Sequence, residues 1–321
     1  MPDSAPAEHE VADRALSGKR HALRVLRVVV TLGAFAYLAS VVELQELLGA
    51  FARVPASAFL EILAWFSFAL WTGAFRWGLL MTTYGAPRRP GAARLLRLYM
   101  VGFFYNTFLP GGVGGDVVRG VATREAFGDG GATAGLSVVL VERVMGMTGL
   151  ILLVAGVTVL HPMPGVPAAH LLGLFGLLGA VGAVLALVFA RRLAPALPGP
   201  LGRLAAMVPV PQRWSPFFVV LVFAVVAHLA GALGGHSLIS AMAPGVELSQ
   251  SLVIIPVALA SQFVPITVSG AGVREAAFVT LFGAVGVPEG AALATSLGMW
   301  GCQLALAGIG GVMSLFGERG K

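Results

Sequence analysis

The chain has 321 residues, of which 57% are hydrophobic and only 11% are charged. Soluble domains carry about 25% charged residues, so this composition excludes a soluble globular protein and indicates an integral membrane protein. The net charge of +6 comes mostly from arginines in polar connections, where it reports membrane topology rather than nucleic-acid binding. The single cysteine, Cys302, excludes a disulfide framework and a cysteine-based metal site, and its apolar surroundings predict a small buried side chain.

The sequence predicts about six membrane-spanning helices. Each is an apolar run close to or above the length of about 20 residues that crosses a hydrocarbon core. The predicted spans cover residues 23–42, 58–81, 133–160, 171–190, 216–242 and 291–316. The polar residues 1–22 are expected to be disordered, and the first span is too long for a signal-peptide core, so we expect it to remain as an anchor. Residues 43–55 and 191–213 are interpreted as an amphipathic connection and a basic, proline-rich connection.

Two further apolar segments are interrupted before they are long enough to span. The first lies within residues 95–128 and breaks at residues 110–115, whereas the second lies within residues 251–286 and breaks at residues 265–272. Irregular backbone at membrane depth survives only where protein buries it or where it lines a wet cavity. We therefore predict two re-entrant hairpins with polar tips. The charged residues that follow the breaks are Asp116, Arg119, Arg274 and Glu275.

The positions of lysine and arginine predict the orientation in the membrane. The N-terminus, residues 88–97, residues 191–213 and the C-terminus are basic, whereas the other connections contain Arg53 and almost nothing else basic. Both termini are therefore expected in the cytoplasm, in a multi-pass protein of the cytoplasmic or inner membrane. The first hairpin then enters from the cytoplasm and the second from the opposite face.

The two broken segments resemble each other. Phe108-Leu109-Pro110 aligns with Phe263-Val264-Pro265, and Arg119 and Arg274 each follow their proline by nine residues. The order of two spans, a hairpin and one span occurs twice, in residues 23–165 and 166–321. Because each half crosses the membrane an odd number of times, the second copy is expected to be inverted, as in many secondary transporters. The alternative is a chance similarity of two glycine- and proline-rich loops, which the matching topology disfavours.

The hairpin tips have the chemistry of an anion site. Helices that begin after each break present unpaired N–H groups and a partial positive charge. Arg119 and Arg274 would add planar guanidinium groups suited to a phosphate. Asp116, Glu142 and Glu275 are their expected partners, because a charge inside the membrane needs one. The competing interpretation is that these arginine–carboxylate pairs only hold helices together.

Three motifs, NTFLPGGVGGDVVRG, VERVMGMTG and VSGAGVREA, together resemble the flippase-like membrane family that includes the transmembrane region of lysylphosphatidylglycerol synthases, the multiple-peptide-resistance proteins. The resemblance covers nearly the whole chain after about Val28 and implies a stand-alone lipid-translocating domain. The full synthases carry a soluble aminoacyl-transfer domain, and we expect this protein to act without one. That expectation leaves the lysyl-lipid substrate open and makes a separate lipid-modifying enzyme a candidate partner. With Ser269 added as a hydrogen-bonding neighbour, the predicted substrate-binding residues are Asn106, Pro110, Gly114, Gly115, Asp116, Arg119, Glu142, Arg143, Ser269, Gly270, Gly272, Arg274 and Glu275.

These features predict a flippase that moves an anionic or aminoacylated phospholipid, or a polyprenyl-phosphate-linked lipid, between leaflets. The alternatives are an integral membrane transferase acting on a lipid phosphate, with Asp116 and Glu142 as its carboxylates, and a small-molecule secondary transporter. The sequence contains no Walker A, haem, flavin or metal signature, so we expect no catalytic residue, cofactor or metal. His228 and His236 are interpreted as packing donors. Small-residue patterns near the C-terminus permit close helix contacts within one subunit or in a homo-oligomer.

Overall fold

The computed structural model describes most of the chain after residue 41. The described residues are 29, 33, 36, 40, 42–109, 113–161, 169–208, 210–261 and 271–316. Within these ranges all regular structure is helical, and no strand occurs. The predicted all-α membrane fold is therefore confirmed for the part of the chain that the structure describes.

Five helices are long and apolar enough to cross a membrane. Each has 25 to 30 residues, and a helix of that length extends about 40 Å. They are α3 (Ala56–Thr83), α6 (Gly131–Leu160), α7 (Ala169–Leu193), α9 (Trp214–Met242) and α12 (Glu289–Leu315). Five of the six predicted spans coincide with them to within three residues at each end. The sixth, residues 23–42, lies almost wholly outside the described residues.

The remaining helices are too short to span a membrane. They are α2 (Leu44–Ala52), α4 (Ala92–Phe108), α5 (Gly114–Ala122), α8 (Gly199–Met207), α10 (Leu248–Ala260) and α11 (Val273–Gly283), with the 3₁₀ helices η1 (Arg124–Gly130) and η2 (Ala194–Ala196). The predicted breaks fall between α4 and α5 and between α10 and α11, although residues 110–112 and 262–270 themselves lie outside the described residues. The helices α2 and α8 occupy segments for which the sequence predicts only connections.

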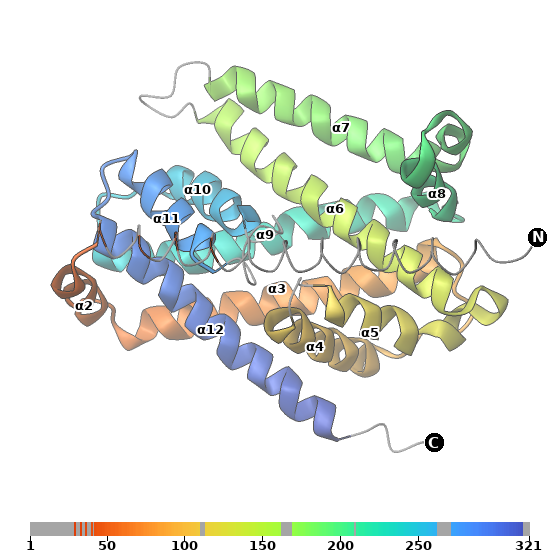
Figure 1. The fold of residues 1–321 in the computed structure, drawn as a ribbon, viewed down its shortest axis with the longest axis horizontal. Helices are drawn as coiled ribbons and strands as arrows, with labels where there is room; N and C mark the ends of the chain where they lie inside the picture. The colour runs from red at the N-terminus through yellow and green to blue at the C-terminus, as the bar shows by residue number, and fades with distance from the viewer. Residues whose placement is uncertain are drawn as a thin grey trace, which may run out of the picture.

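The long helices run in both directions along one axis (Figure 1). In this view α3, α7 and α12 run from left to right, whereas α6 and α9 run from right to left. The helix α3 ends and α6 begins at the right of the view, so the α4–α5 pair joins two helix ends on the same side. The α10–α11 pair joins the end of α9 to the start of α12 at the left.

The order of elements occurs twice in the described chain. The series α2, α3, α4, α5 and α6 has the same succession of short, long, broken and long helices as α8, α9, α10, α11 and α12. Packing follows the same succession, because α4 packs against α12 while α10 packs against α6. The pairs α5–α6 and α11–α12 also correspond, and α3 packs extensively against α9 at the centre.

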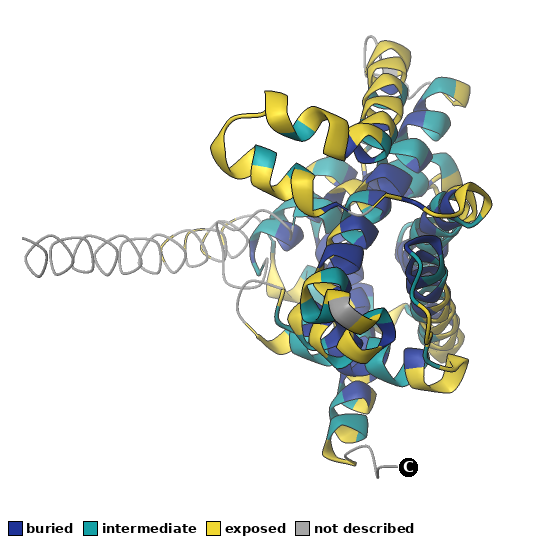
Figure 2. Ribbon diagram, turned by 90° about the vertical axis from the view of Figure 1, so that its right-hand side faces the viewer, coloured by how far each residue is buried: buried dark blue, intermediate teal, exposed yellow. Residues whose placement is uncertain are grey.

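The interior contains two apolar cores. One gathers residues of α3, α9, α10, α11 and α12 around Phe278 and Phe282, and the other gathers residues of α3, α6, α7 and α9 around Trp77 and Phe217. Figure 2 shows buried residues concentrated where the helices meet and exposed residues toward the periphery. Cys302 is buried, as predicted.

One side of α7 is apolar and exposed. Phe175 and Leu178 are more than two-thirds exposed, and further leucines and valines follow along the same helix. A contiguous apolar surface of this kind marks contact with a membrane or a protein. Together with the length and composition of the five long helices, it supports a multi-pass membrane protein.

Candidate functional site

The helices α4 and α5 approach each other closely through two glycines. A Cβ atom at Gly115 would lie 1.7 Å from the carbonyl oxygen of Gly102, so no larger residue fits without moving the backbone. Asn106 ties the same helices together: its Oδ1 accepts a hydrogen bond from the Gly115 amide at 2.8 Å, and its Nδ2 donates to Asp116 at 3.1 Å. This contact places the first turn of α5 beside α4 and directs Asp116 into the interior.

Arg119 is the centre of a buried ion-pair network. Its Nη2 donates to Asp116 Oδ1 at 2.7 Å, and its Nη1 donates to Glu142 Oε2 at 2.8 Å. The guanidinium carbon lies 5.2 Å from the centroid of the Trp77 ring and 4.7 Å from that of Tyr99. Aromatic rings at these distances attract the cation, so Arg119 is fixed by two carboxylates and two rings.

The network extends to α3 and to the next residue of α6. Arg76 of α3 donates to Glu142 Oε1 at 3.0 Å, so Glu142 receives an arginine on each carboxylate oxygen. Arg143 Nε donates to Asp116 Oδ2. Asp116 therefore accepts hydrogen bonds from three side chains on three different helices.

Burial differs across this network. The side chains of Arg76, Arg119, Glu142 and Asp116 are at most 10% exposed, whereas that of Arg143 is 34% exposed. Moving charges out of water costs several kcal/mol per ion, and good geometry with shared hydrogen bonds offsets this cost. The Arg143–Asp116 pair is therefore the part of the network that a ligand can reach from outside.

A second, smaller cluster lies at the start of α11. Arg274 pairs with Glu275, and its Nε lies 2.9 Å from Glu275 Oε1 and 3.3 Å from Ser296 Oγ of α12. Glu275 also accepts a hydrogen bond from the Gly272 amide at 2.7 Å, and Gly272 has a φ of +83°, a conformation that favours glycine. The ring of Trp300 lies 5.5 Å from the Arg274 guanidinium carbon.

The two clusters are built alike but remain separate. Glu142 follows Arg119 by 23 residues, and Ser296 follows Arg274 by 22, so in each case the helix after the broken pair supplies an acceptor. In the first cluster the acceptor is a carboxylate, and in the second the carboxylate comes from α11 itself. Among the described residues, Arg119 and Arg274 share no partner.

Most of the predicted site residues lie in one of the two clusters. The structure brings Asn106, Gly115, Asp116, Arg119, Glu142 and Arg143 together in one network, and Gly272, Arg274 and Glu275 in the other. Gly114 begins α5, where an added Cβ would meet Leu109. Pro110, Ser269 and Gly270 lie outside the described residues.

Five contributors were not in the predicted set: Arg76, Trp77, Tyr99, Ser296 and Trp300. Arg76 had a detectable signal, because an arginine within an apolar span requires a partner. The three aromatic residues and Ser296 had none, since such residues are common in apolar helices and only the packing brings them to an arginine.

The two histidines of α9 lie at contacts between neighbouring helices. His228 Nε2 lies 3.0 Å from the carbonyl oxygen of Gly146 in α6, and His236 Nδ1 lies 2.9 Å from Ser251 Oγ in α10. Both contacts join neighbouring helices, in keeping with their interpretation from the sequence. No group of three metal-binding side chains occurs among the described residues.

A protein-family model described as the lysylphosphatidylglycerol synthase TM region matches residues 24–311. The chain belongs to this family. The match confirms the resemblance found in the three sequence motifs. The matched residues include both arginine clusters. A comparison with curated proteins found no match.

Proposed function

We propose that this protein moves a phosphate-bearing lipid between the two leaflets of its membrane and acts as a transporter rather than as an enzyme. The substrate class is an anionic or aminoacylated phospholipid, or a polyprenyl-phosphate-linked lipid. The buried arginine network on α3, α5 and α6, beside the break between α4 and α5, is the observation that carries this proposal.

The network has the chemistry to hold a phosphate and then release it. Asp116 is shared by Arg119 and Arg143, and Arg143 is the more exposed of the two. A phosphate oxygen offers the same charge and hydrogen-bonding geometry as a carboxylate oxygen. The headgroup phosphate would therefore approach past Arg143 and exchange with Asp116, which would pair with the arginines again after release.

Residues 23–165 and 166–321 would form two inverted repeats, each with a re-entrant hairpin. Three observations support this: the repeated order of elements, the corresponding packing pairs, and the opposite directions of α3 and α9 (Figure 1). The broken pairs also join helix ends at opposite sides of the molecule. Alternating exposure of two inverted hairpins would carry a headgroup across while its chains stay in lipid.

Arginines gather at one end of the helices. Arg88, Arg191, Arg203 and Arg213 belong to connections at the end where α3 stops and α9 starts, whereas Glu247 and Glu289 lie at the other end. By the positive-inside rule, we infer that the arginine-rich end faces the cytoplasm, with both termini there.

The direct test reconstitutes the purified protein in liposomes with fluorescent phospholipids and follows transbilayer movement by surface quenching. We expect Arg119→Ala and Arg274→Ala to slow movement about tenfold or more, because each removes a charge-assisted phosphate contact. Arg203→Ala, an exposed arginine on α8, is the control and should leave the rate unchanged. Gel filtration and thermal unfolding would check folding, and Arg143→Gln would replace Arg119→Ala if that variant unfolds. Unchanged movement in the folded variants would contradict the proposal.

The competing function is a membrane transferase acting on a lipid phosphate. The observation that favours it is the pair of carboxylates, Asp116 and Glu142, held by one guanidinium. Mass spectrometry of the lipids extracted after reconstitution distinguishes the two functions. A chemically altered lipid that disappears with Glu142→Gln would favour the transferase, whereas movement of unaltered lipid supports transport.

A further inference from the structure

A cavity of about 500 Å³ lies apart from both arginine clusters. It occupies the end of the molecule where α3 and α7 finish and where α6 and α9 begin. Its volume is within the range of about 300–1,000 Å³ that is usual for small-ligand sites. The lining residues are Tyr84, Gly130, Thr133, Ala134, Ser137, Arg191, Met207, Val208, Val210, Pro211 and Gln212.

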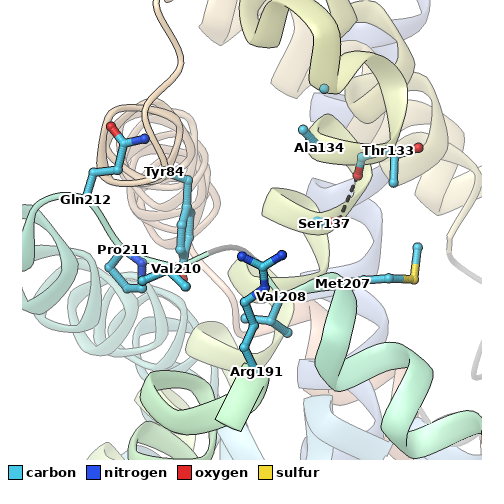
Figure 3. Close-up of a pocket in the computed structure, with 11 residues that line it drawn as sticks. Tyr84, Thr133, Ala134, Ser137, Arg191, Met207, Val208, Val210, Pro211 and Gln212 are labelled. Atoms are coloured by element: carbon cyan, nitrogen blue, oxygen red, sulfur yellow. Dashed lines mark hydrogen bonds between the residues drawn. The ribbon is translucent and has the colours of Figure 1, made fainter. Parts of the chain in front are cut away.

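The polar side chains of this cavity are one arginine, three hydroxyl-bearing residues and one glutamine. Figure 3 shows the Arg191 guanidinium near the middle, with Tyr84 on one side and Thr133 and Ser137 of α6 on the other. Among the side chains that the structure describes, no carboxylate lines the cavity and Arg191 forms no ion pair. A cation surrounded by hydroxyl and amide groups without an acid selects an anion.

Tyr84 provides a second indication of a missing ligand. The residue is 7% exposed, and its buried hydroxyl has no hydrogen-bond partner among the described residues. Buried polar groups are normally satisfied, so a lone buried hydroxyl beside a cavity requires an explanation. Burial raises the pKa of the Tyr84 phenol, so it stays protonated at neutral pH and can donate.

We propose that this cavity binds the phosphate group of an anionic headgroup, held by the Arg191 guanidinium and the Tyr84 hydroxyl. The apolar part of the lining, Met207, Val208 and Val210, suits the glycerol and upper chain of a phospholipid. The cavity also lies at the ends of the long helices, where headgroups lie in a bilayer. The inference goes beyond translocation, because binding here requires no movement of lipid across the membrane.

The test measures lipid binding by native mass spectrometry on the purified full chain in detergent. Dihexanoyl-phosphatidylglycerol is the anionic probe, and dihexanoyl-phosphatidylcholine is the zwitterionic control. We expect Arg191→Gln to weaken binding of the anionic probe about tenfold, and Tyr84→Phe to weaken it several-fold. The matched control is Arg192→Gln, since Arg192 is the next residue but lies 5.7 Å from the Phe189 ring centroid and does not line the cavity. Arg192→Gln should bind like the wild type.

Competition distinguishes a lipid headgroup from free phosphate. If sodium phosphate displaces the probe no better than sodium chloride of equal ionic strength, the ligand is the lipid. If phosphate alone displaces it, and Arg191→Gln abolishes this displacement, the site still binds phosphate but takes it from solution. Equal binding by Arg191→Gln and Arg192→Gln overturns the proposal, as does equal binding of the two probes by the wild type.

Additional variants separate a loss of lipid binding from misfolding and from a loss of lipid transport. Arg191→Lys keeps the charge and should recover most of the binding, and Tyr84→Phe removes a single oxygen if Arg191→Gln does not elute like the wild type. Arg119→Ala should retain the part of the probe binding that Arg191→Gln removes, even where it loses lipid movement. A failure of the translocation proposal would therefore leave this inference standing, and the reverse also holds.

Discussion

Glu142 is the residue on which two arginines of different helices depend. Arg76 of α3 occupies one of its oxygens and Arg119 of α5 occupies the other. Its side chain is 3% exposed, so water cannot replace the carboxylate as a partner. Removing one member of such a buried pair leaves an uncompensated charge, which costs more than the pair itself contributes.

Glu142→Gln should therefore destabilise the fold by about 3–5 kcal/mol, because it leaves the buried Arg76 guanidinium without its carboxylate partner and removes one of the two carboxylates that hold Arg119. Thermal unfolding in detergent, followed by circular dichroism, measures the effect. The control is Glu61→Gln on α3, where the carboxylate is exposed and the change should stay within about 0.5 kcal/mol. Equal unfolding temperatures for the two variants would contradict a structural role for the shared carboxylate.

The sequence predicted which charged residues belong to the candidate site, but not which of them pair with one another. Asp116, Arg119, Glu142 and Arg143 were all expected near the first break, and the structure joins them. The pairing of Glu142 with Arg76 could not be predicted, because these residues are 66 positions apart and only the packing of α3 on α6 brings them together.

The broken pairs depend on small residues at their crossing points. Gly102 and Gly115 let α4 and α5 meet backbone to backbone, and Gly310 of α12 approaches the carbonyl oxygen of Met100 in the same way. Small residues at helix crossings permit such approach in membranes, where packing replaces the hydrophobic effect as the source of association. The close helix crossings that these glycines permit therefore help to position the arginine network.

Gly115→Ala should destabilise the protein by about 1–3 kcal/mol or more, because its Cβ would lie 1.7 Å from the Gly102 oxygen and the helices must separate. Gly156→Ala on α6 is the matched control, since no atom lies within 4 Å of the added Cβ. That variant should be neutral or up to about 1 kcal/mol more stable, because alanine favours a helix. Thermal unfolding of both variants in one detergent decides the comparison, and a Gly115→Ala variant as stable as Gly156→Ala would refute the close crossing.

The two ends of α12 are fixed by polar contacts from other helices. Glu46 of α2 accepts a hydrogen bond from the Gly290 amide at 3.0 Å, and Arg97 of α4 donates to the carbonyl oxygen of Met313 at 3.1 Å. A carboxylate at the start of a helix and a guanidinium at its end both complement the helix dipole. The contacts hold α12 in register with α2 and α4.

Element length decided what the sequence could predict. Apolar runs of 25 residues or more have a single reading, so the five described spans were predicted to within a few residues at each end. The nine-residue helices α2 and α8 were interpreted only as connections. A helix this short shows too few turns for a periodic pattern, and Pro198 and Pro200 at the start of α8 look like a loop although proline is tolerated in a first turn.

The whole molecule has the arrangement that two inverted halves would give. α3 and α9 run in opposite directions at the centre, and each broken pair packs against the last long helix of the other half, α4 on α12 and α10 on α6. In such an arrangement, the exchange of contacts would couple the two broken pairs, because a shift of α12 would move the surface on which α4 rests. This coupling is what alternating exposure would need.

Cysteine labelling in sealed cells tests the inverted topology. In a Cys302→Ala background, single cysteines would replace Gly91 and Arg124, which flank the α4–α5 pair, and Gly245 and Ala284, which flank the α10–α11 pair. All four positions are exposed, so a membrane-impermeant maleimide can reach them from the correct side. We expect the first two cysteines to react only after the cells are opened and the last two to react in intact cells, since each hairpin returns to the side from which it starts. If the two cysteines that flank one pair react from opposite sides, that pair crosses the membrane and the two halves are not inverted copies.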